Sequence, residues 1–195
     1  MLVLAAVQAD VSKPDDIRRL FAETKKAFGK LDILVNNAGI YEFAPLEGIS
    51  AEHFHKQFDL NVPGLLLTTQ EAVKHFGPSG GSIVNISSAA ATLAPPNTSV
   101  YSGTKAAVTA ITRSPAQELG PRKVRVNAIA PGVIETEGLP VSGIAGSDFQ
   151  RQAEAQTPPG RIGQPGDIAP AVVFLASSDS AWTTGETLYI SGGLR

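Results

Sequence analysis

The stretch LDILVNNAG, residues 31–39, is the part of the sequence that most directly indicates the fold class. Its first half, Leu31–Val35, is an apolar run without regular polar alternation, which is typical of a strand buried on both faces of a sheet. A helix pattern over Pro14–Phe28, with Ser12 as its expected cap, precedes this strand. A second helix pattern follows from Ser50, with Pro63 as the expected site of a kink. Strands that alternate with helices in this way predict a parallel sheet.

The same alternation continues to the end of the chain. Helix patterns cover about 101–119 and 167–176, and strand patterns cover 1–9, 82–86, 124–129 and 187–190. This rhythm predicts an α/β fold, a doubly wound parallel sheet with helices on both faces, in a single domain that spans residues 1–195. Between Gly138 and Gly163 the periodicity fails and small residues dominate, so we expect residues 138–163 to form a substrate lid.

The composition excludes several functional classes. A formal net charge of -2 and 17% charged residues offer no basic surface to nucleic acid or to a membrane. The absence of cysteine fits a reducing cytoplasm and excludes a zinc ribbon and a thiolate nucleophile. His53 and His55 lie two positions apart on an expected helix and point in different directions, so no metal site is expected. A small neutral or anionic metabolite is the expected partner.

A tyrosine and a lysine at helical spacing indicate redox chemistry. Tyr101 and Lys105 are four positions apart, on one face of the expected helix. A Lys ammonium at that spacing would bring the tyrosine pKa, ordinarily about 10, down toward neutrality, so that the side chain could serve as acid or base on an alcohol or ketone. Two surface side chains would give the same spacing by chance. Ser88 adds support because it follows the expected strand at 82–86, where a parallel sheet binds ligands, and Ser87 is the competing hydroxyl.

Five motifs, taken in order, resemble those of the classical short-chain dehydrogenases/reductases. They are Asn36-Asn37-Ala38-Gly39, Asn61 in NVPG, Ser88 after IVNIS, Tyr101-x-x-x-Lys105 and Pro131-Gly132-Val133-Ile134-Glu135-Thr136. The closing TGETLYISGG is similar to the family's last strand, so the resemblance spans nearly the whole chain. It implies a Rossmann-type fold and an oxidoreductase that moves hydride between NAD(P)(H) and an alcohol or ketone. Within the family, the chain resembles the 3-oxoacyl-thioester reductases and the glucose and other sugar dehydrogenases.

The resemblance also implies roles for the matching residues. Tyr101 would be the general acid/base, Ser88 would orient the carbonyl, and Lys105 would lower the tyrosine pKa and bind the nicotinamide ribose. Asn61 would hold a water that links Lys105 to solvent, although a side chain that patches a kinked helix would look the same. Asp10 would approach the adenine, although it also suits a strand-end turn. The other expected cofactor contacts are Val11, Asn37, Ala38, Gly39, Pro131, Gly132, Ile134 and Thr136.

The sequence departs from the family at its N-terminal end. The family begins with a strand, a glycine-rich turn and a helix that hold the cofactor pyrophosphate, whereas the glycine cluster at 77–81 precedes an internal strand and is expected to be a plain turn. We therefore expect a sheet that lacks the first βαβ portion, in which residues 1–9 can pair with Leu31–Val35. This chain is expected to bind nicotinamide cofactors weakly, and the choice between NAD and NADP stays open.

Two functional hypotheses follow. The first is a cytoplasmic NAD(P)-dependent oxidoreductase that acts on an alcohol or carbonyl compound and, as the family implies, forms a homo-oligomer, either a dimer or a tetramer. The second is a catalytically silent, truncated relative that serves as a binding or oligomerising module. Pro115 lies inside the expected helix at 101–119, which packs across a dimer interface in the family, so its effect on that interface stays open.

Overall fold

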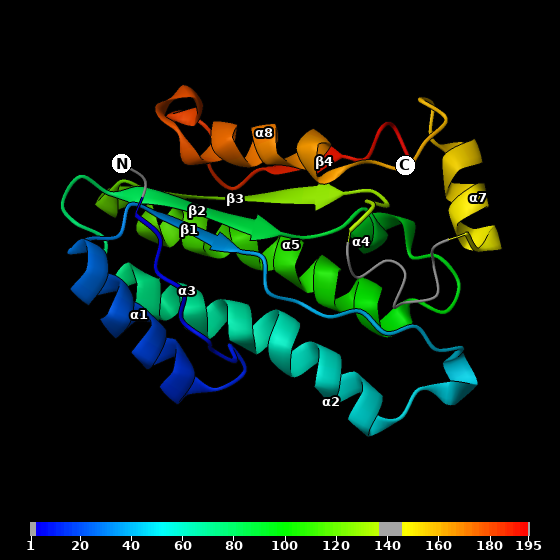
Figure 1. The fold of residues 1–195 in the computed structure, drawn as a ribbon, viewed down its shortest axis with the longest axis horizontal. Coiled ribbons are helices and arrows are strands. Elements are labelled where there is room, and N and C mark those ends of the chain that lie inside the picture. Colours follow the sequence, from blue (N-terminus) through cyan, green and yellow to red (C-terminus); the bar gives the residue numbers. More distant parts are fainter. Residues whose placement is uncertain (1–2, 137–145, 195) are drawn as a thin grey trace.

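A computed structural model describes residues 3–136 and 146–194, and its centre is a four-stranded parallel sheet. The strands lie in the order β1-β2-β3-β4 (Figure 1). Each strand pairs with the next one along the chain, from the Ile33↔Ser82 pair at one side to the Pro131↔Ile190 pair at the other. The predicted α/β fold class is therefore confirmed. The strand bounds are β1 Ile33–Asn36, β2 Gly81–Ile86, β3 Val124–Pro131 and β4 Thr187–Ile190.

Helices cover both faces of the sheet, as predicted. α3 (Leu65–Val73) and α5 (Ser99–Leu119) pack on one face, and α8 (Pro165–Ala176) packs on the other (Figure 1). α1 (Pro14–Phe28) forms an outer layer against α3. Two separate clusters of buried apolar residues result. Ile17, Phe21, Ala72, Ile83, Ala116, Val124 and Val126 form one apolar cluster, and Val84, Ile129 and Leu175 form another on the α8 side.

α1 begins and ends close to the predicted positions, but its N-terminal cap differs. Gly29 ends the helix in the left-handed region, at φ 77°, which glycine adopts without a Cβ penalty. Lys13 occupies the N-cap position, and its side chain makes no capping hydrogen bond. The prediction that Ser12 caps this helix is wrong, because the Ser12 hydroxyl and amide both donate to the Asp10 carboxylate.

The long helical segment after Ser50 is interrupted as Pro63 predicted. α2 (Ala51–Asp59) begins with the Ser50 hydroxyl accepting a hydrogen bond from the amide of His53. A π-helical turn over Leu60–Gly64 contains Pro63, and α3 continues from Leu65. Proline has no amide hydrogen to donate to the preceding turn, and the wider π-helical turn accommodates the missing hydrogen bond. This turn also carries Asn61, which is buried.

Two strand predictions at the N-terminal end are wrong. Residues 3–9 form no strand, and they do not pair with β1, whose one partner among the described residues is β2. Without a neighbouring backbone to accept and donate hydrogen bonds, an apolar run at this position has nothing to make it a strand. β1 is consequently an edge strand. It is also not buried on both faces as predicted, because Ile33 is 46% and Val35 is 40% exposed.

The remaining elements are short, apart from α7 (Asp148–Gln156), which lies in the segment predicted as a lid. This helix forms although the apolar periodicity fails in the segment, and the Ser147 hydroxyl caps it by accepting from the Gln150 amide. Residues 137–145 of that segment lie outside the described residues. α5 passes Pro115 without interruption. Single turns complete the chain: Leu46–Gly48, α4 (Ala90–Leu93), Gly120–Arg122 and Ser178–Ser180.

No helix in the described ranges is long and apolar enough to cross a membrane.

Candidate active site

A cavity of about 880 Å³ lies beyond the carboxyl ends of the strands. Its floor includes Val35 near the end of β1 and the final residues of β2 and β3, Ile86 and Pro131. α5 contributes Tyr101 and Lys105, while α7 and α8 contribute to the opposite walls. A parallel sheet places its ligand sites at this end because the connections that follow the strands gather there. The volume lies in the range of cofactor and substrate pockets in proteins.

Tyr101, Lys105 and Ser88 meet inside this cavity. The Ser88 side chain lies beside the Tyr101 phenol in this cavity. Lys105 lies one helical turn after Tyr101, with its Nζ 5.8 Å from the centre of the phenol ring. The same Nζ donates a hydrogen bond of 2.9 Å to the carbonyl oxygen of Ile86. The predicted residues are thus brought together, from the end of β2 and from one face of α5.

Burial shifts the pKa of both ionisable groups against their charged forms. Desolvation raises the pKa of the Tyr101 phenol above its usual value, and the hydrogen bond from Ser88 opposes that rise. Desolvation also lowers the pKa of Lys105 to about 8. The expectation that Lys105 brings the tyrosine pKa down toward neutrality is not met in this structure. Burial of both groups therefore favours a neutral phenol.

The two neighbouring serines have different partners. Ser87 is buried, and its hydroxyl donates to the carbonyl oxygen of Lys105 at 2.9 Å and lies 2.8 Å from the Thr109 hydroxyl. It therefore joins the end of β2 to α5. The Ser88 hydroxyl is half-buried beside Tyr101, and it accepts a hydrogen bond from the Ala90 amide. Ser88 is consequently the hydroxyl that a substrate oxygen could reach.

The Asn61 side chain is fully engaged with the protein. Its Oδ1 accepts from the Ile40 amide at 2.9 Å, and its Nδ2 donates to the Ile40 carbonyl at 2.8 Å and to the Thr104 hydroxyl at 3.1 Å. It therefore fastens the segment after β1 to the helix that carries Tyr101. The alternative interpretation is therefore wrong, because the side chain does not patch the π-helical turn, whereas the expected water between Asn61 and Lys105 stays a prediction.

The residues present fit the flat nicotinamide end of a dinucleotide. A Cβ at Gly39 would lie 3.6 Å from Lys105 Nζ and 3.2 Å from Asn61 Oδ1, so the bare main chain keeps open the approach to the lysine. On the other side, the Val133 carbonyl and the Glu135 amide each pair with Gly163, and this fixes the loop that follows β3. The expected cofactor residues that line the cavity are Asn37, Gly39, Tyr101, Lys105, Pro131, Gly132, Ile134 and Thr136.

Three of the expected cofactor residues do not line the cavity. Ala38 is one of them. Asp10 uses its carboxylate to hold Ser12, and hydrogen bonds from Ser12 lower its pKa. The main chain of Val11 lies against Gly64, where an added Cβ would come within 3.0 Å of its carbonyl oxygen. Asp10 therefore acts as a turn residue before α1, which was the alternative interpretation. The glycine cluster at 77–81 is a turn leading into β2, as predicted.

One side of the cavity is an aromatic wall that the sequence motifs did not predict. Tyr41 and Phe43 line it, and their ring centres lie 6.1 and 6.0 Å from that of Tyr101, in edge-on arrangements. Their two-residue spacing after the Asn-Asn-Ala-Gly motif is the available signal, because alternate residues of an extended segment share one face. Phe149, Gln152 and Gln156 of α7 line the cavity as well.

A doubly wound parallel sheet with such a cavity at its carboxyl end defines the α/β class of dinucleotide-dependent enzymes. Comparison with known proteins narrows the class. Residues 2–195 match the family model described as enoyl-(acyl carrier protein) reductase. The chain belongs to the short-chain dehydrogenase/reductase family, and it is an oxidoreductase of that family.

Three similar proteins illustrate the relationship. An uncharacterised oxidoreductase of Methylorubrum extorquens is 53% identical over 190 residues, which cover 97% of this chain and 76% of that protein. A glucose 1-dehydrogenase of Gluconobacter oxydans is 40% identical over 187 residues, covering 95% of this chain and 70% of its own length. The crystal structure of a glucose/ribitol dehydrogenase-type family member from Brucella melitensis superposes with a TM-score of 0.91 at 32% identity, covering 98% of this chain and 76% of that one.

Proposed function

We propose that this protein interconverts an alcohol and a ketone with NAD(P)(H), and that Tyr101 is the general acid/base. The observation that carries the proposal is the contact between the Ser88 and Tyr101 side chains, which lie together inside the cavity one helical turn from Lys105. A substrate oxygen that takes the place of this contact would lie within reach of both hydroxyl groups. Family membership supports the use of a nicotinamide cofactor.

The residues would divide the work as follows. A bound nicotinamide supplies or accepts the hydride. In reduction, the Tyr101 hydroxyl gives its proton to the carbonyl oxygen while Ser88 holds that oxygen in place by a second hydrogen bond. In oxidation, the same phenol, once ionised, takes the alcohol proton. Lys105 would bind the nicotinamide ribose.

The cofactor would lie across the ends of the strands. Asn37 and Gly39 line the cavity at the end of β1, and Ile134 and Thr136 line it after β3, so the nicotinamide end would pass between these two segments. The carboxamide of the nicotinamide would be held by the Ile134 backbone and the Thr136 hydroxyl. This assignment leaves NAD and NADP equally suitable.

The substrate is proposed to be a 3-oxoacyl-thioester-like or sugar-like alcohol or ketone. The match to the enoyl-(acyl carrier protein) reductase model supports the first, and the similarity to a glucose 1-dehydrogenase supports the second. Lys105 is the one charged side chain among the described residues that line the cavity, which favours an uncharged reacting end. We further propose that the chain is one cytoplasmic domain whose segment at 138–163 covers the substrate, and that it works as a homo-oligomer.

The direct test is a reductase assay at millimolar NADH or NADPH, with a panel of sugars, simple ketones and oxoacyl thioesters. The high cofactor concentration ensures that a weak cofactor site is also occupied. Turnover that the Tyr101→Phe variant loses would support the proposal. If the folded wild-type chain turns over no member of the panel with either cofactor, the silent binding module becomes the better hypothesis.

A further inference from the structure

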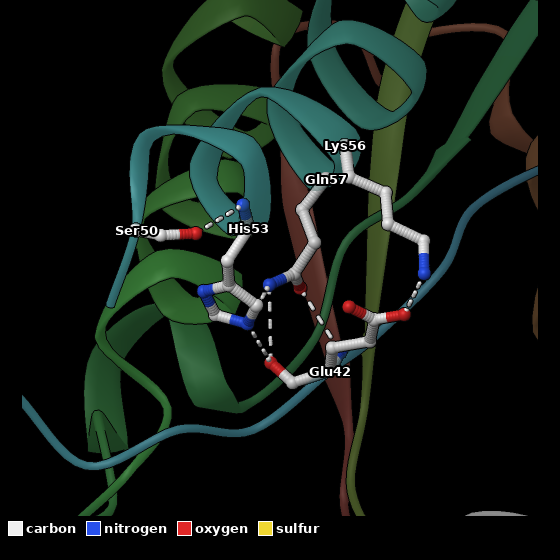
Figure 2. A network of polar contacts seen from close by, with 5 residues as sticks. All are labelled: Glu42, Ser50, His53, Lys56 and Gln57. Atoms are coloured by element: carbon white, nitrogen blue, oxygen red, sulfur yellow. Dashed lines mark hydrogen bonds and ion pairs between the residues drawn. The ribbon is translucent and has the colours of Figure 1, made fainter. Parts of the chain in front are cut away.

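Two buried carboxamides grip the extended segment that follows β1. Asn61 exchanges two hydrogen bonds with the main chain of Ile40, as described above. One helical turn earlier, Gln57 does the same for Glu42: its Oε1 accepts from the Glu42 amide at 3.1 Å, and its Nε2 donates to the Glu42 carbonyl at 3.0 Å (Figure 2). We call these two bonds the Gln57 clamp. The two amides thus act as a substitute strand for alternate residues of the segment.

The clamp lies between the two aromatic residues of the cavity wall. Tyr41 and Phe43 flank Glu42 in the sequence, and their ring centres are 5.8 Å apart. Both rings meet the ring of Tyr101 edge-on. Fixing the Glu42 peptide therefore fixes where both rings stand relative to the phenol. The Ala44 amide donates to the Asn97 carbonyl at 2.9 Å, which closes the segment on its far side.

Gln57 is suited to this purpose because it is completely buried, at 0% exposed. A buried carboxamide costs free energy unless its donors and acceptor are all used. Besides the clamp, its Nε2 lies 3.0 Å from His53 Nε2, and this imidazole nitrogen lies 3.3 Å from the Glu42 carbonyl (Figure 2). Lys56, the residue before Gln57 in the helix, contacts Glu42 differently: it forms an exposed ion pair with the Glu42 carboxylate and not with the Glu42 peptide.

We propose that Gln57 is a positioning residue which, through the Glu42 peptide, holds Tyr41 and Phe43 as a rigid wall against Tyr101, and that this wall selects uncharged ketones that carry a ring. The inference rests on the proposed function for its substrate part. Aromatic rings bind one another in edge-on or offset arrangements, so a substrate ring gains most from a wall that does not move. A small acyclic ketone has no ring to pack against the wall, so it gains less from a rigid wall.

The first test monitors the surroundings of the wall residues by NMR and requires no enzyme activity. The chain contains three tyrosines, Tyr41, Tyr101 and Tyr189, so 3-fluorotyrosine labelling gives three fluorine NMR signals. Gln57→Met keeps the length of the side chain and removes both bonds of the clamp. We expect the Tyr41 and Tyr101 signals to shift or broaden, while the signal of Tyr189 in β4 stays unchanged.

Lys56→Met is the matched control, because it removes the neighbouring contact to the Glu42 side chain and keeps the clamp. We expect all three fluorine signals to remain as in the wild type. Unchanged Tyr41 and Tyr101 signals in the folded Gln57→Met variant would overturn the positioning role. A common shift of all three signals would also overturn it, because that result would indicate a general loss of packing.

The second test compares 4-phenyl-2-butanone with 2-butanone, which present the same methyl ketone with and without a phenyl ring. In Gln57→Met we expect KM for the phenyl compound to rise about tenfold, with kcat within about twofold and kcat/KM for 2-butanone nearly unchanged. Lys56→Met is expected to leave KM and kcat unchanged for both substrates. An equal loss on both ketones would overturn the selectivity. If no ketone is turned over by the wild type, the proposed function and the selectivity fail together, and the fluorine signals still decide the positioning role.

Discussion

The Nζ of Lys105 lies 2.9 Å from the carbonyl oxygen of Ile86, and this hydrogen bond joins the tyrosine-bearing helix to the end of the strand that leads to Ser88. It also holds the ammonium in an apolar cavity, where burial lowers the pKa of Lys105 to about 8. The contact therefore sets both the geometry of the candidate site and its charge.

The lowered pKa of Lys105 predicts a pH-dependent cost to stability. Below about pH 8 the folded protein must keep a buried ammonium charged, whereas in the unfolded chain the pKa is about 10.5. We expect Lys105→Met to raise the free energy of unfolding at neutral pH by up to about 3 kcal/mol. This advantage should shrink between about pH 8 and pH 10.5, because the folded wild type then releases its proton. Urea unfolding of both proteins over this range measures the difference, and a constant difference would contradict the prediction.

Removal of the Tyr101 hydroxyl should abolish catalysis without unfolding the chain. Tyr101→Phe keeps the ring that packs against Tyr41 and Phe43 and deletes the proton donor. We expect kcat for ketone reduction to fall about 10² to 10⁴-fold. Steady-state kinetics together with thermal unfolding check this. A variant that retains more than about a tenth of the wild-type kcat would exclude Tyr101 as the proton donor.

The two serines should respond in opposite ways to truncation. Ser88→Ala should lower kcat about 10²-fold, because it removes the hydroxyl beside Tyr101, and should leave stability nearly unchanged. Ser87→Ala should instead lower the free energy of unfolding by about 1 kcal/mol, because it breaks the bond to the Lys105 carbonyl, with kcat within a few-fold. Parallel unfolding and kinetic measurements separate the two effects. The opposite pattern would show that Ser87 is the substrate-binding hydroxyl.

The rates of reduction and oxidation should depend differently on pH. Burial raises the pKa of Tyr101, so the phenol keeps its proton through the neutral range. We expect kcat for ketone reduction to stay level from roughly pH 6 to pH 8, because reduction needs the neutral phenol as acid. Alcohol oxidation needs the phenolate, so its kcat should rise steadily over the same interval. An oxidation rate that peaks at neutral pH would contradict this assignment.

Two glycine substitutions in the turn before β2 should differ sharply in how far they lower the free energy of unfolding. A Cβ at Gly80 would lie 2.0 Å from the Lys123 carbonyl oxygen, and this glycine also has φ +83°, so Gly80→Ala should lower the free energy of unfolding by roughly 3 kcal/mol. Gly77 has nothing within 4 Å of an added Cβ and no positive φ, so Gly77→Ala serves as the control. Chemical denaturation measures both. Equal costs would mean that the turn adjusts freely.

Much of the fold could be predicted because local patterns dominate where an element is covered by its neighbours. The β4 strand was predicted with its observed bounds, and the helix Pro14–Phe28 likewise. The interruption at Pro63 also followed from covalent structure, since proline has no amide hydrogen to donate. The run at 3–9 and the exposure of β1 could not be predicted in this way, because pairing and coverage depend on which strands lie alongside.

The sequence by itself determined which residues are chemically competent: Tyr101 and Lys105 lie one helical turn apart, and Ser88 follows a strand, whatever surrounds them. Only the tertiary structure decided how those groups behave. Burial raises the pKa of Tyr101 and lowers that of Lys105, and desolvation depends on neighbours that are distant in the chain. The Gln57 clamp was likewise decided by the tertiary structure, because a glutamine finds a main-chain partner fifteen residues away only after the helix and the extended segment have packed together.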